Sequence, residues 1–387
     1  MFYETASSSW GQEEKDALKQ VIDAGFFTMG KRVAEFEATF AAYFGKKFGV
    51  MVNSGSSANL IAVAALFFKK DKPLKPGDEV IVPAISWATT YYPLQQYGLK
   101  LRFVDVDLHT LNMDCSALEE ALTPNTRMIL GVSILGNPAE LNVMRAFADK
   151  HDLYFMEDNC ESMDAELNGK KTGTFGDLNT FSFFFSHHIS TMEGGMILTD
   201  DQELYELAFS LRNHGQTKGL PESSRLINHR LNDFDEAYRF ILPGYNVRPT
   251  ELNAAAGLVQ IEKMPAMTMQ RRSNWAYFQE LFAHDSRFII QKEHGKTSAF
   301  SFTLIPTLES GLQRDNIVRK LKESSIDCRM ITGGNFLQHE VIKYCDHSLA
   351  GEIKHAKAAH DRGFFVGNHP HDLRPQLDLL QRVLRDV

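Results

Sequence analysis

The sequence is poor in cysteine and in long apolar runs, and both shortages narrow the classes of protein it can belong to. It has four cysteines in 387 residues, and no two of them form a C-x-x-C pair. This spacing gives no support for a zinc ribbon or a four-cysteine iron–sulfur cluster, so reduced thiols and no metal site are expected. The longest apolar run, LIAVAALFF at residues 60–68, is too short to cross a bilayer.

Basic charge is also scarce, with 41 lysines and arginines against 49 acidic residues and a formal net charge of −8. This balance argues against a broad nucleic-acid-binding surface. The first residues, MFYETASSSWGQEEKD, lack the basic start and the apolar segment of a secretory signal. We therefore expect a cytoplasmic protein that binds neither nucleic acid nor membrane.

Short apolar runs alternate with amphipathic segments along the first half of the chain. The runs are continuous rather than alternating, which is typical of strands covered on both faces. The predicted strands are residues 48–52, 79–84, 101–106, 127–132, 153–158, 180–185 and 195–199. Helical patterns lie between them, so the sequence predicts an α/β fold with a mostly parallel sheet.

The pattern changes after LPGYNVRPTEL, at residues 242–252, where two prolines and a glycine mark a turn. A long helical segment follows, and then a strand-like run at 298–305. We therefore predict a large domain over residues 1–250 and a smaller α+β domain over residues 251–387.

Two segments could bind a planar, phosphorylated ligand at the ends of strands. In MVNSGSSANL, Gly55 allows close approach of a ligand, and Ser56 and Ser57 open a helix whose N–H groups attract anions. An ordinary serine N-cap explains the same pattern. In VPAISWATT, Trp87 could stack on a ring or simply cover the sheet end.

Three further polar side chains follow strands or turns. Asp158 closes a strand and could pair with a protonated pyridine nitrogen, or serve only as an N-cap. In PGYNVRPTEL, Asn246 could donate to a phosphate and Arg248 could hold a carboxylate through two bonds. A solvated turn is the simpler interpretation of these last two.

Two adjacent histidines, His187 and His188, follow the aromatic run at 183–185. Neighbouring residues of a strand point to opposite faces, so both rings cannot face one ligand unless a turn intervenes. A metal site formed by both histidines and Glu193 is conceivable, although adjacent histidines are poorly spaced for it.

Taken in order, these segments resemble the nucleotide-sugar aminotransferase family of pyridoxal-phosphate enzymes. The matching segments include FFTMGKRVAEFEATFAAYFG, VNSGSSANL, VPAISWATT, FVDVD, EDNCES, GKKTGTFGD, FSFFFSHHISTMEGG and GYNVRPTEL. The resemblance implies fold type I, with a seven-stranded, mostly parallel sheet and a smaller C-terminal α+β domain. It also implies pyridoxal 5′-phosphate (PLP) or its amino form, pyridoxamine 5′-phosphate (PMP), as the cofactor.

The resemblance assigns the cofactor phosphate to the turn at Gly55, Ser56 and Ser57. Ser182 is expected to add a hydroxyl to that site, and Asn246 is expected to reach in from the partner subunit of a homodimer.

The resemblance also assigns three residues to the cofactor ring. Trp87 is expected to stack on it, Asp158 to pair with its nitrogen, and Glu161 to lie near its hydroxyl. Family members commonly have glutamine or histidine at the last position, so the charge of Glu161 is a departure.

The largest departure is His187, which stands where the family's aminotransferases have the lysine that binds the cofactor covalently. Imidazole has no primary amine, so the cofactor is expected to be held without a covalent link. A branch of the family with this histidine is expected to remove the C3 hydroxyl of a nucleotide-linked 4-keto-6-deoxy sugar. GDP is the expected nucleotide, L-glutamate the expected amino donor and His187 the expected base, with Arg248 and His188 as candidate substrate contacts.

Several alternatives remain at this point. The protein could be an ordinary sugar aminotransferase with a relocated lysine, Lys170 or Lys171 being nearest in the sequence. It could be a dehydratase of CDP-linked sugars, although a related enzyme of that kind carries an iron–sulfur cluster. It could also be a sensor or scaffold that binds the cofactor without catalysis.

Overall fold

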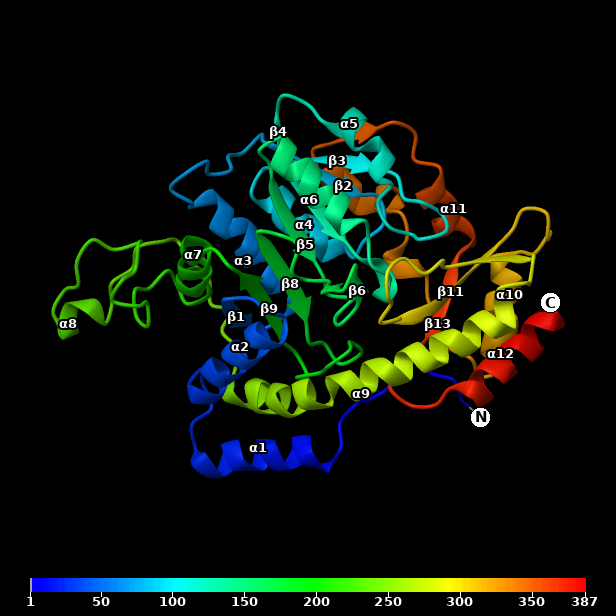
Figure 1. Cartoon of the computed structure of the whole chain (residues 1–387), viewed down its shortest axis with the longest axis horizontal. Coiled ribbons are helices and arrows are strands. Elements are labelled where there is room, and N and C mark those ends of the chain that lie inside the picture. The colour runs from blue at the N-terminus through cyan, green and yellow to red at the C-terminus, as the bar shows by residue number, and fades with distance from the viewer. Residues whose placement is uncertain (1) are drawn as a thin grey trace.

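The computed structural model describes residues 2–387, and a sheet of eight strands forms its centre (Figure 1). The strand order is β1-β9-β8-β5-β4-β2-β3-β12. Every neighbouring pair from β8 to β12 is parallel, whereas β9 runs antiparallel to both β1 and β8. The strands are β1 (Phe48–Val52), β2 (Glu79–Pro83), β3 (Lys100–Val104), β4 (Thr126–Val132), β5 (Tyr154–Asp158), β8 (Leu178–Ser182), β9 (Gly195–Thr199) and β12 (His347–Ala350).

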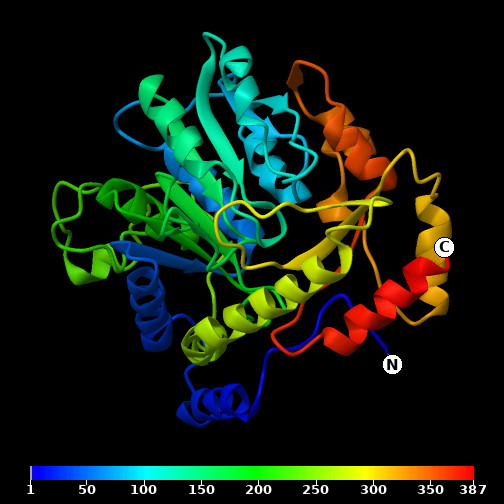
Figure 2. The same cartoon turned by 45° about the vertical axis from the view of Figure 1, so that its right-hand side comes forward.

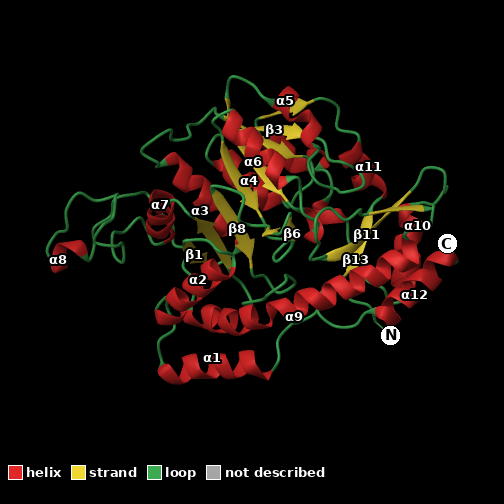
Figure 3. Cartoon of the chain, viewed as in Figure 1, coloured by secondary structure: helices red, strands yellow, loops and turns green. Residues whose placement is uncertain are grey.

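Helices cover both faces of this sheet because its strands are apolar on both faces (Figure 3). Successive strand residues point to opposite faces, so Val50 and Val52 face one side and Met51 the other. The first face packs against α3 (Gly55–Phe67), α4 (Ala88–Gln96) and α7 (Gln202–Arg212). The second packs against α2 (Lys31–Tyr43), α5 (Leu118–Ala121), α6 (Leu141–Lys150) and the first half of α9 (Glu251–Phe282).

A second, antiparallel sheet forms the core of the C-terminal lobe. Its order is β10-β11-β13, with β10 (Phe288–Ile290), β11 (Ser301–Pro306) and β13 (Phe364–Gly367). Trp275, Phe278 and Phe302 pack in this core with the apolar stripe of α12 (Arg374–Arg385) and with α10 (Arg314–Glu323). Figure 2 shows α12 beside α9, with both chain ends at this side of the molecule.

Helix α9 connects the two lobes. It has 32 residues and is therefore about 48 Å long. Its first half packs on α2 and the large sheet, and its second half packs in the C-terminal lobe. The helix α1 (Gln12–Ala24) lies along its outer side (Figure 1). The domain boundary near residue 250 remains a prediction, and the structure adds that α9 begins at Glu251.

The expected α/β fold with a mostly parallel sheet is confirmed, with two corrections. The sheet has eight strands rather than seven, because β12 from the C-terminal part pairs with the edge strand β3. The strand predicted over 180–185 ends at Ser182, because the chain turns after Phe183, where the His187 N–H donates to the carbonyl of Phe184 at 2.9 Å. The predictions at 48–52 and 195–199 match β1 and β9.

The remaining β-strands form the hairpin of β6 (Glu166–Leu167) and β7 (Lys170–Lys171). The remaining α-helices are the short α8 (Asp233–Glu236) and α11 (His355–Arg362), whose Ala356 and Ala359 pack in the core on the first face of the large sheet. Among residues 2–387, no helix is both long and apolar enough to cross a bilayer.

Candidate active site at the carboxyl ends of the central strands

Most of the expected site residues lie at one edge of the large sheet. Asp158 ends β5, Ser182 ends β8, and the turn before α3 directly follows β1. These three strands run in the same direction, so their carboxyl ends meet at one edge. Open parallel sheets bind their ligands at this edge.

The turn before α3 presents hydroxyl groups and a helix N-terminus to the same space. Ser54 is the N-cap and accepts from the backbone N–H of Ser57 at 3.0 Å. The Ser56 hydroxyl lies 2.8 Å from that of Thr89. A Cβ at position 55 would lie 2.6 Å from the Cβ of Ser182, so glycine permits the close approach of β8 to this helix. The N-cap interpretation and the anion-site interpretation therefore both apply to this turn.

Asp158 is buried and holds its carboxylate in place through three donors. Its Oδ2 accepts from Asn59 at 2.9 Å and from Thr90 at 2.8 Å, and its Oδ1 accepts from the backbone N–H of Cys160 at 3.1 Å. Thr180 in turn donates to Asn59 at 2.6 Å. Within residues 2–387, no lysine, arginine or histidine forms an ion pair with this carboxylate, so it can receive a cationic ligand.

Trp87 does not belong to the core. It is the N-cap residue of α4 and is 60% exposed, so its indole ring can receive a ligand. Three residues later, Thr90 donates to Asp158, which places this helix start beside the carboxylate.

Glu161 is positioned by two residues with left-handed backbones. Its Oε2 accepts from the backbone N–H of Leu135 at 3.0 Å and from the hydroxyl of Thr332 at 3.2 Å. Leu135 has φ 54° and Thr332 has φ 39°, conformations that cost energy for residues other than glycine. Although the residue is not fully enclosed, burial raises the pKa of Glu161 to about 7. Near pH 7 a carboxyl group with this pKa is about half protonated, and its protonated form can donate a hydrogen bond as glutamine does.

His187 is held in one tautomer with a free nitrogen. Its Nδ1 lies 2.6 Å from the carbonyl oxygen of Cys160, and a carbonyl only accepts, so Nδ1 carries the proton. The other nitrogen, Nε2, then keeps its lone pair and has no partner among the described residues. Burial lowers the pKa of His187 to about 4, which keeps the ring neutral near pH 7. A neutral imidazole with a free Nε2 is a suitable proton acceptor.

His188 faces away from the space that His187 faces. The residue is 1% exposed, and its Nε2 donates to the carbonyl oxygen of Ser298 at 2.9 Å. This burial disagrees with the expected direct contact with a substrate. The two histidine rings therefore do not converge on one metal ion. Among residues 2–387, no group of acidic, cysteine and histidine side chains could hold a metal ion.

Asn246 and Arg248 lie close to the turn before α3 in the same chain. The backbone N–H of Asn53 donates to Val247 at 3.0 Å, and Arg248 Nε donates to Asn246 Oδ1 at 3.0 Å. Arg248 forms no ion pair with any of residues 2–387, so its guanidinium group is available to an anion. Both residues therefore lie next to the turn before α3.

The two lysines considered as replacements for the missing one are already engaged. The Lys170 ammonium lies 4.3 Å from the ring centre of Phe175, and Lys171 pairs with Asp164 and lies over Tyr43. Both belong to the hairpin strand β7. This placement gives no support to an aminotransferase with a relocated lysine.

Several residues that hold the site together are not predicted from the sequence. Thr90, Asn59 and Thr332 each donate to Asp158 or Glu161. The TT pair after Trp87 was a usable signal, since hydroxyls just past a strand end often reach the site. Nothing in the sequence indicated that Thr332, 171 residues from Glu161, meets it.

Comparison with known proteins gives one family. The model of the DegT/DnrJ/EryC1/StrS aminotransferase family matches residues 8–383. The GDP-4-keto-6-deoxy-D-mannose 3-dehydratase of Yersinia pseudotuberculosis is 48% identical over 382 residues, which cover 98% of this chain and 97% of that protein.

Solved structures of such a dehydratase are similar over the whole chain. The Escherichia coli enzyme with bound hydrated PLP has a TM-score of 0.97 and 46% identity, covering 99% of this chain and 100% of that one. A structure with a trapped PLP–glutamate geminal diamine has the same four values. In a variant of this dehydratase, a serine and the adjacent histidine are replaced by asparagine and lysine. It has a TM-score of 0.96 and 46% identity, covering 98% of this chain and 100% of that one.

Proposed function

Because the chain belongs to the DegT/DnrJ/EryC1/StrS aminotransferase family, we propose that it is a PLP-dependent 3-dehydratase of a GDP-linked 4-keto-6-deoxy sugar. In the net reaction a C–H bond replaces the C3–OH bond of the sugar. L-Glutamate supplies the electrons and leaves as 2-oxoglutarate and ammonia. The near-complete coverage of relatives with this activity supports the proposal.

The residues present fit the cofactor. The hydroxyls of Ser56, Ser57 and Ser182 and the α3 N-terminus suit its phosphate. Asp158, which has no cationic partner among residues 2–387, suits a protonated ring nitrogen, and the exposed indole of Trp87 suits the face of the ring. When bound, the cofactor would supply the amine that condenses with the keto group of the sugar and a ring that serves as an electron sink.

His187 is the residue that determines which reaction follows. With the cofactor and sugar bound, its free Nε2 would accept a proton from the C4′ carbon of the cofactor, and the resulting imidazolium would give that proton to the departing C3 hydroxyl. A lysine at this position would instead attach the cofactor and release an amino sugar. The observation that carries the proposal is therefore a neutral histidine with a free Nε2 beside Asp158.

The dehydratase variant with the serine and histidine replacements supports this assignment. In that protein a serine directly precedes the replaced histidine. Ser186–His187 is the single Ser-His pair in this chain. We infer that His187 is the corresponding position, and that its lysine variant tests the same exchange here.

The proposal is tested by absorbance and by product analysis. Adding L-glutamate to the PLP-loaded protein should convert the spectrum from the aldehyde to the amine form, and adding the GDP-linked keto sugar should then release ammonia and a dideoxy sugar. His187→Lys is expected to bind the cofactor covalently and to lose dehydration. His187→Asn should lose dehydration without covalent attachment. An amino sugar as the main product of the unaltered protein, without ammonia, would contradict the proposal.

We also propose a homodimer in which Asn246 completes the partner's phosphate site. The segment between α7 and α9 supports this, because it extends from the body of the protein and exposes Phe234, Tyr238 and Phe240 (Figure 1). Exposed aromatic clusters of this kind are typical of protein interfaces. Arg248 is the proposed contact for the glutamate carboxylate, and a cytoplasmic location remains a prediction.

A further inference from the structure

Residues 297–300 of the C-terminal lobe cross to the large sheet and bind the loop after β4. Ser298 N–H donates to the carbonyl of Gly136 at 2.9 Å, and Phe300 N–H donates to that of Leu135 at 2.9 Å. A Cβ at position 136 would lie 2.6 Å from the Phe300 nitrogen, so glycine is required for this approach. The segment is therefore bonded to the same loop whose Leu135 donates to Glu161.

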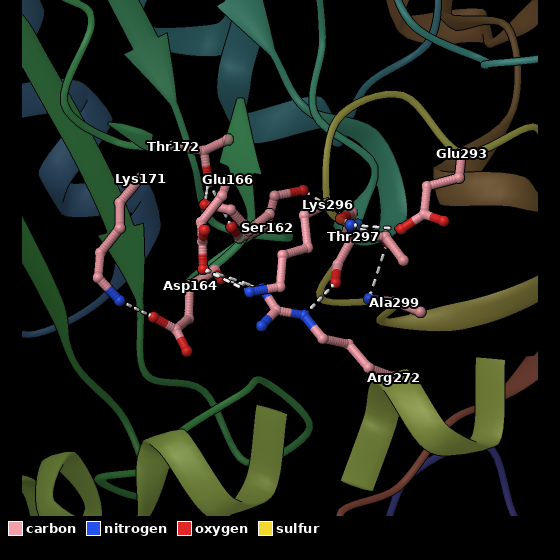
Figure 4. A network of polar contacts seen from close by, with 12 residues as sticks. Ser162, Asp164, Glu166, Lys171, Thr172, Arg272, Glu293, Lys296, Thr297 and Ala299 are labelled. Carbon is pink, nitrogen blue, oxygen red and sulfur yellow. Dashed lines mark hydrogen bonds and ion pairs between the residues drawn. The ribbon is translucent and has the colours of Figure 1, made fainter. Parts of the chain in front are cut away.

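Side chains reinforce this connection from α9 (Figure 4). The Nε of Arg272 donates to the carbonyl of Thr297 at 2.8 Å, and its Nη2 donates to the carbonyl of Asp164 at 3.0 Å. Thr297 Oγ1 donates to the Gly136 carbonyl at 2.7 Å. Because Asp164 lies on the loop that follows Asp158, Arg272 joins that loop to residues 297–300.

The other side of the 297–300 segment contacts both histidines. The Ser298 carbonyl accepts from His188 Nε2 at 2.9 Å. The Phe300 ring centre lies 5.2 Å from that of His187 and 5.8 Å from that of His188. One short segment of the C-terminal lobe thus touches the proposed base and its neighbour.

His187 needs this support because its own backbone does not fix the direction of its ring. The residue lies in a turn after β8. Among residues 2–387 its side chain has one hydrogen bond, to Cys160, which leaves the ring free to rotate about that bond. A base displaced by about 1 Å can lose about 100-fold in rate. The Phe300 ring blocks this rotation from one side, and the His188–Ser298 bond fixes the backbone one residue on.

We propose that Phe300 and the His188–Ser298 hydrogen bond position His187 for proton transfer, an inference that rests on the proposed function. Residues 297–300 are thereby a positioning element that the C-terminal lobe supplies to the site of the large sheet. Phe300 and His188 do not react. They determine where Nε2 of His187 points.

Phe300→Leu tests the proposal, with Phe302→Leu as the matched control. Phe302 lies two residues on, is fully buried against Phe278 at 4.8 Å, and is outside the contacts of both histidines. We expect Phe300→Leu to lower kcat by roughly 10- to 100-fold with KM for the sugar unchanged. Phe302→Leu should lower the Tm more and kcat little. Phe300→Tyr, which keeps the ring, should restore kcat.

A readout without substrate or cofactor separates positioning from stability. In histidine-labelled, cofactor-free protein, ¹⁵N NMR should show His187 protonated at Nδ1 alone, and Phe300→Leu should give a mixture of tautomers. His188→Leu should act in the same way, whereas His188→Gln can still donate to Ser298. His369→Leu is the control, because His369 is equally buried but donates to Glu4.

The outcomes distinguish this proposal from the proposed function. A Phe300→Leu protein with unaltered kcat and an unaltered His187 tautomer overturns the positioning role, even if dehydration is confirmed. A tautomer mixture in Phe300→Leu, in a protein that forms no dideoxy sugar, supports the positioning role and contradicts the proposed reaction. If Phe302→Leu loses as much kcat as Phe300→Leu, the effect is one of stability and the proposal is wrong.

Discussion

At the scale of single residues, the site contains two partly buried groups, His187 and Glu161, whose pKa values are shifted toward their neutral forms. Burial lowers the pKa of His187 to about 4 and raises that of Glu161 to about 7. Near pH 7 the imidazole of His187 is therefore a free base, and the carboxyl group of Glu161 is about half protonated. The carboxyl group of Asp158 is fixed in place by three hydrogen-bond donors.

Glu161 makes stability depend on pH in the absence of cofactor. Its folded pKa lies above the ordinary value of 4.5, so the folded state holds more protons than the unfolded state between about pH 4.5 and 7. The free energy of unfolding should therefore fall as pH rises through this window. Glu161→Gln should remove roughly 1–3 kcal/mol of that fall, as measured by urea unfolding at pH 5 and pH 7.5. The exposed Glu193→Gln is the control, and an equal change in both variants would contradict the assignment.

At the scale of elements, the site is assembled from turns that glycine allows to approach one another. Gly55 brings α3 against β8, and Gly136 brings the loop after β4 against residues 297–300. Both contacts join segments far apart in the sequence. The lengths of the predicted strands therefore do not locate the site, whereas the glycines just past the strand ends indicate where two segments approach closely.

Gly136→Ala should lower the free energy of unfolding for two reasons, backbone strain and a steric contact, which can be tested separately. Gly136 has φ 92°, and an added Cβ would meet backbone atoms of Ala299 and Phe300 at 2.6 to 2.7 Å. We expect a loss of roughly 2–4 kcal/mol in the free energy of unfolding, measured by urea titration. Gly311→Ala has a similar positive φ of 66° but no atom within 4 Å, and should lose only about 1 kcal/mol. Equal losses would show that backbone strain alone, and not the contact, determines the cost.

At the scale of the whole molecule, the proposed sharing of sites between subunits can be tested by mixing two inactive variants. If Asn246 serves the partner's site, an Asp158→Asn chain and an Asn246→Ala chain form a mixed dimer with one intact site. Random mixing should then restore roughly a quarter of the unaltered activity, since half of the dimers are mixed and each has one intact site.

The alternative assignment of Asn246 predicts no recovery of activity on mixing. If Asn246 serves the site of its own chain, each site of the mixed dimer carries one substitution, and activity stays at the level of the separate variants. Size-exclusion chromatography with light scattering checks that the mixed protein is dimeric.

Much of this organisation follows from local sequence. Continuous apolar runs determine the strands because a covered parallel strand needs apolar residues on both faces, and the runs at 48–52 and 195–199 match β1 and β9. Ser56, which follows β1, and Asp158 and Ser182, which end β5 and β8, lie at one edge because parallel strands end together. The absence of lysine at His187 is likewise a property of sequence alone, and it excludes covalent attachment of the cofactor at that position.

Only the tertiary structure decided the rest, because it depends on contacts between distant segments. The sequence does not place β12 beside β3, Thr332 on Glu161, or residues 297–300 against the two histidines. Nor does it separate the roles of His187 and His188, which are adjacent in the chain but donate to Cys160 and Ser298 on different sides. The chemistry available to this protein is thus determined by residue types, whereas the direction in which each group points is determined by the packing of one lobe on the other.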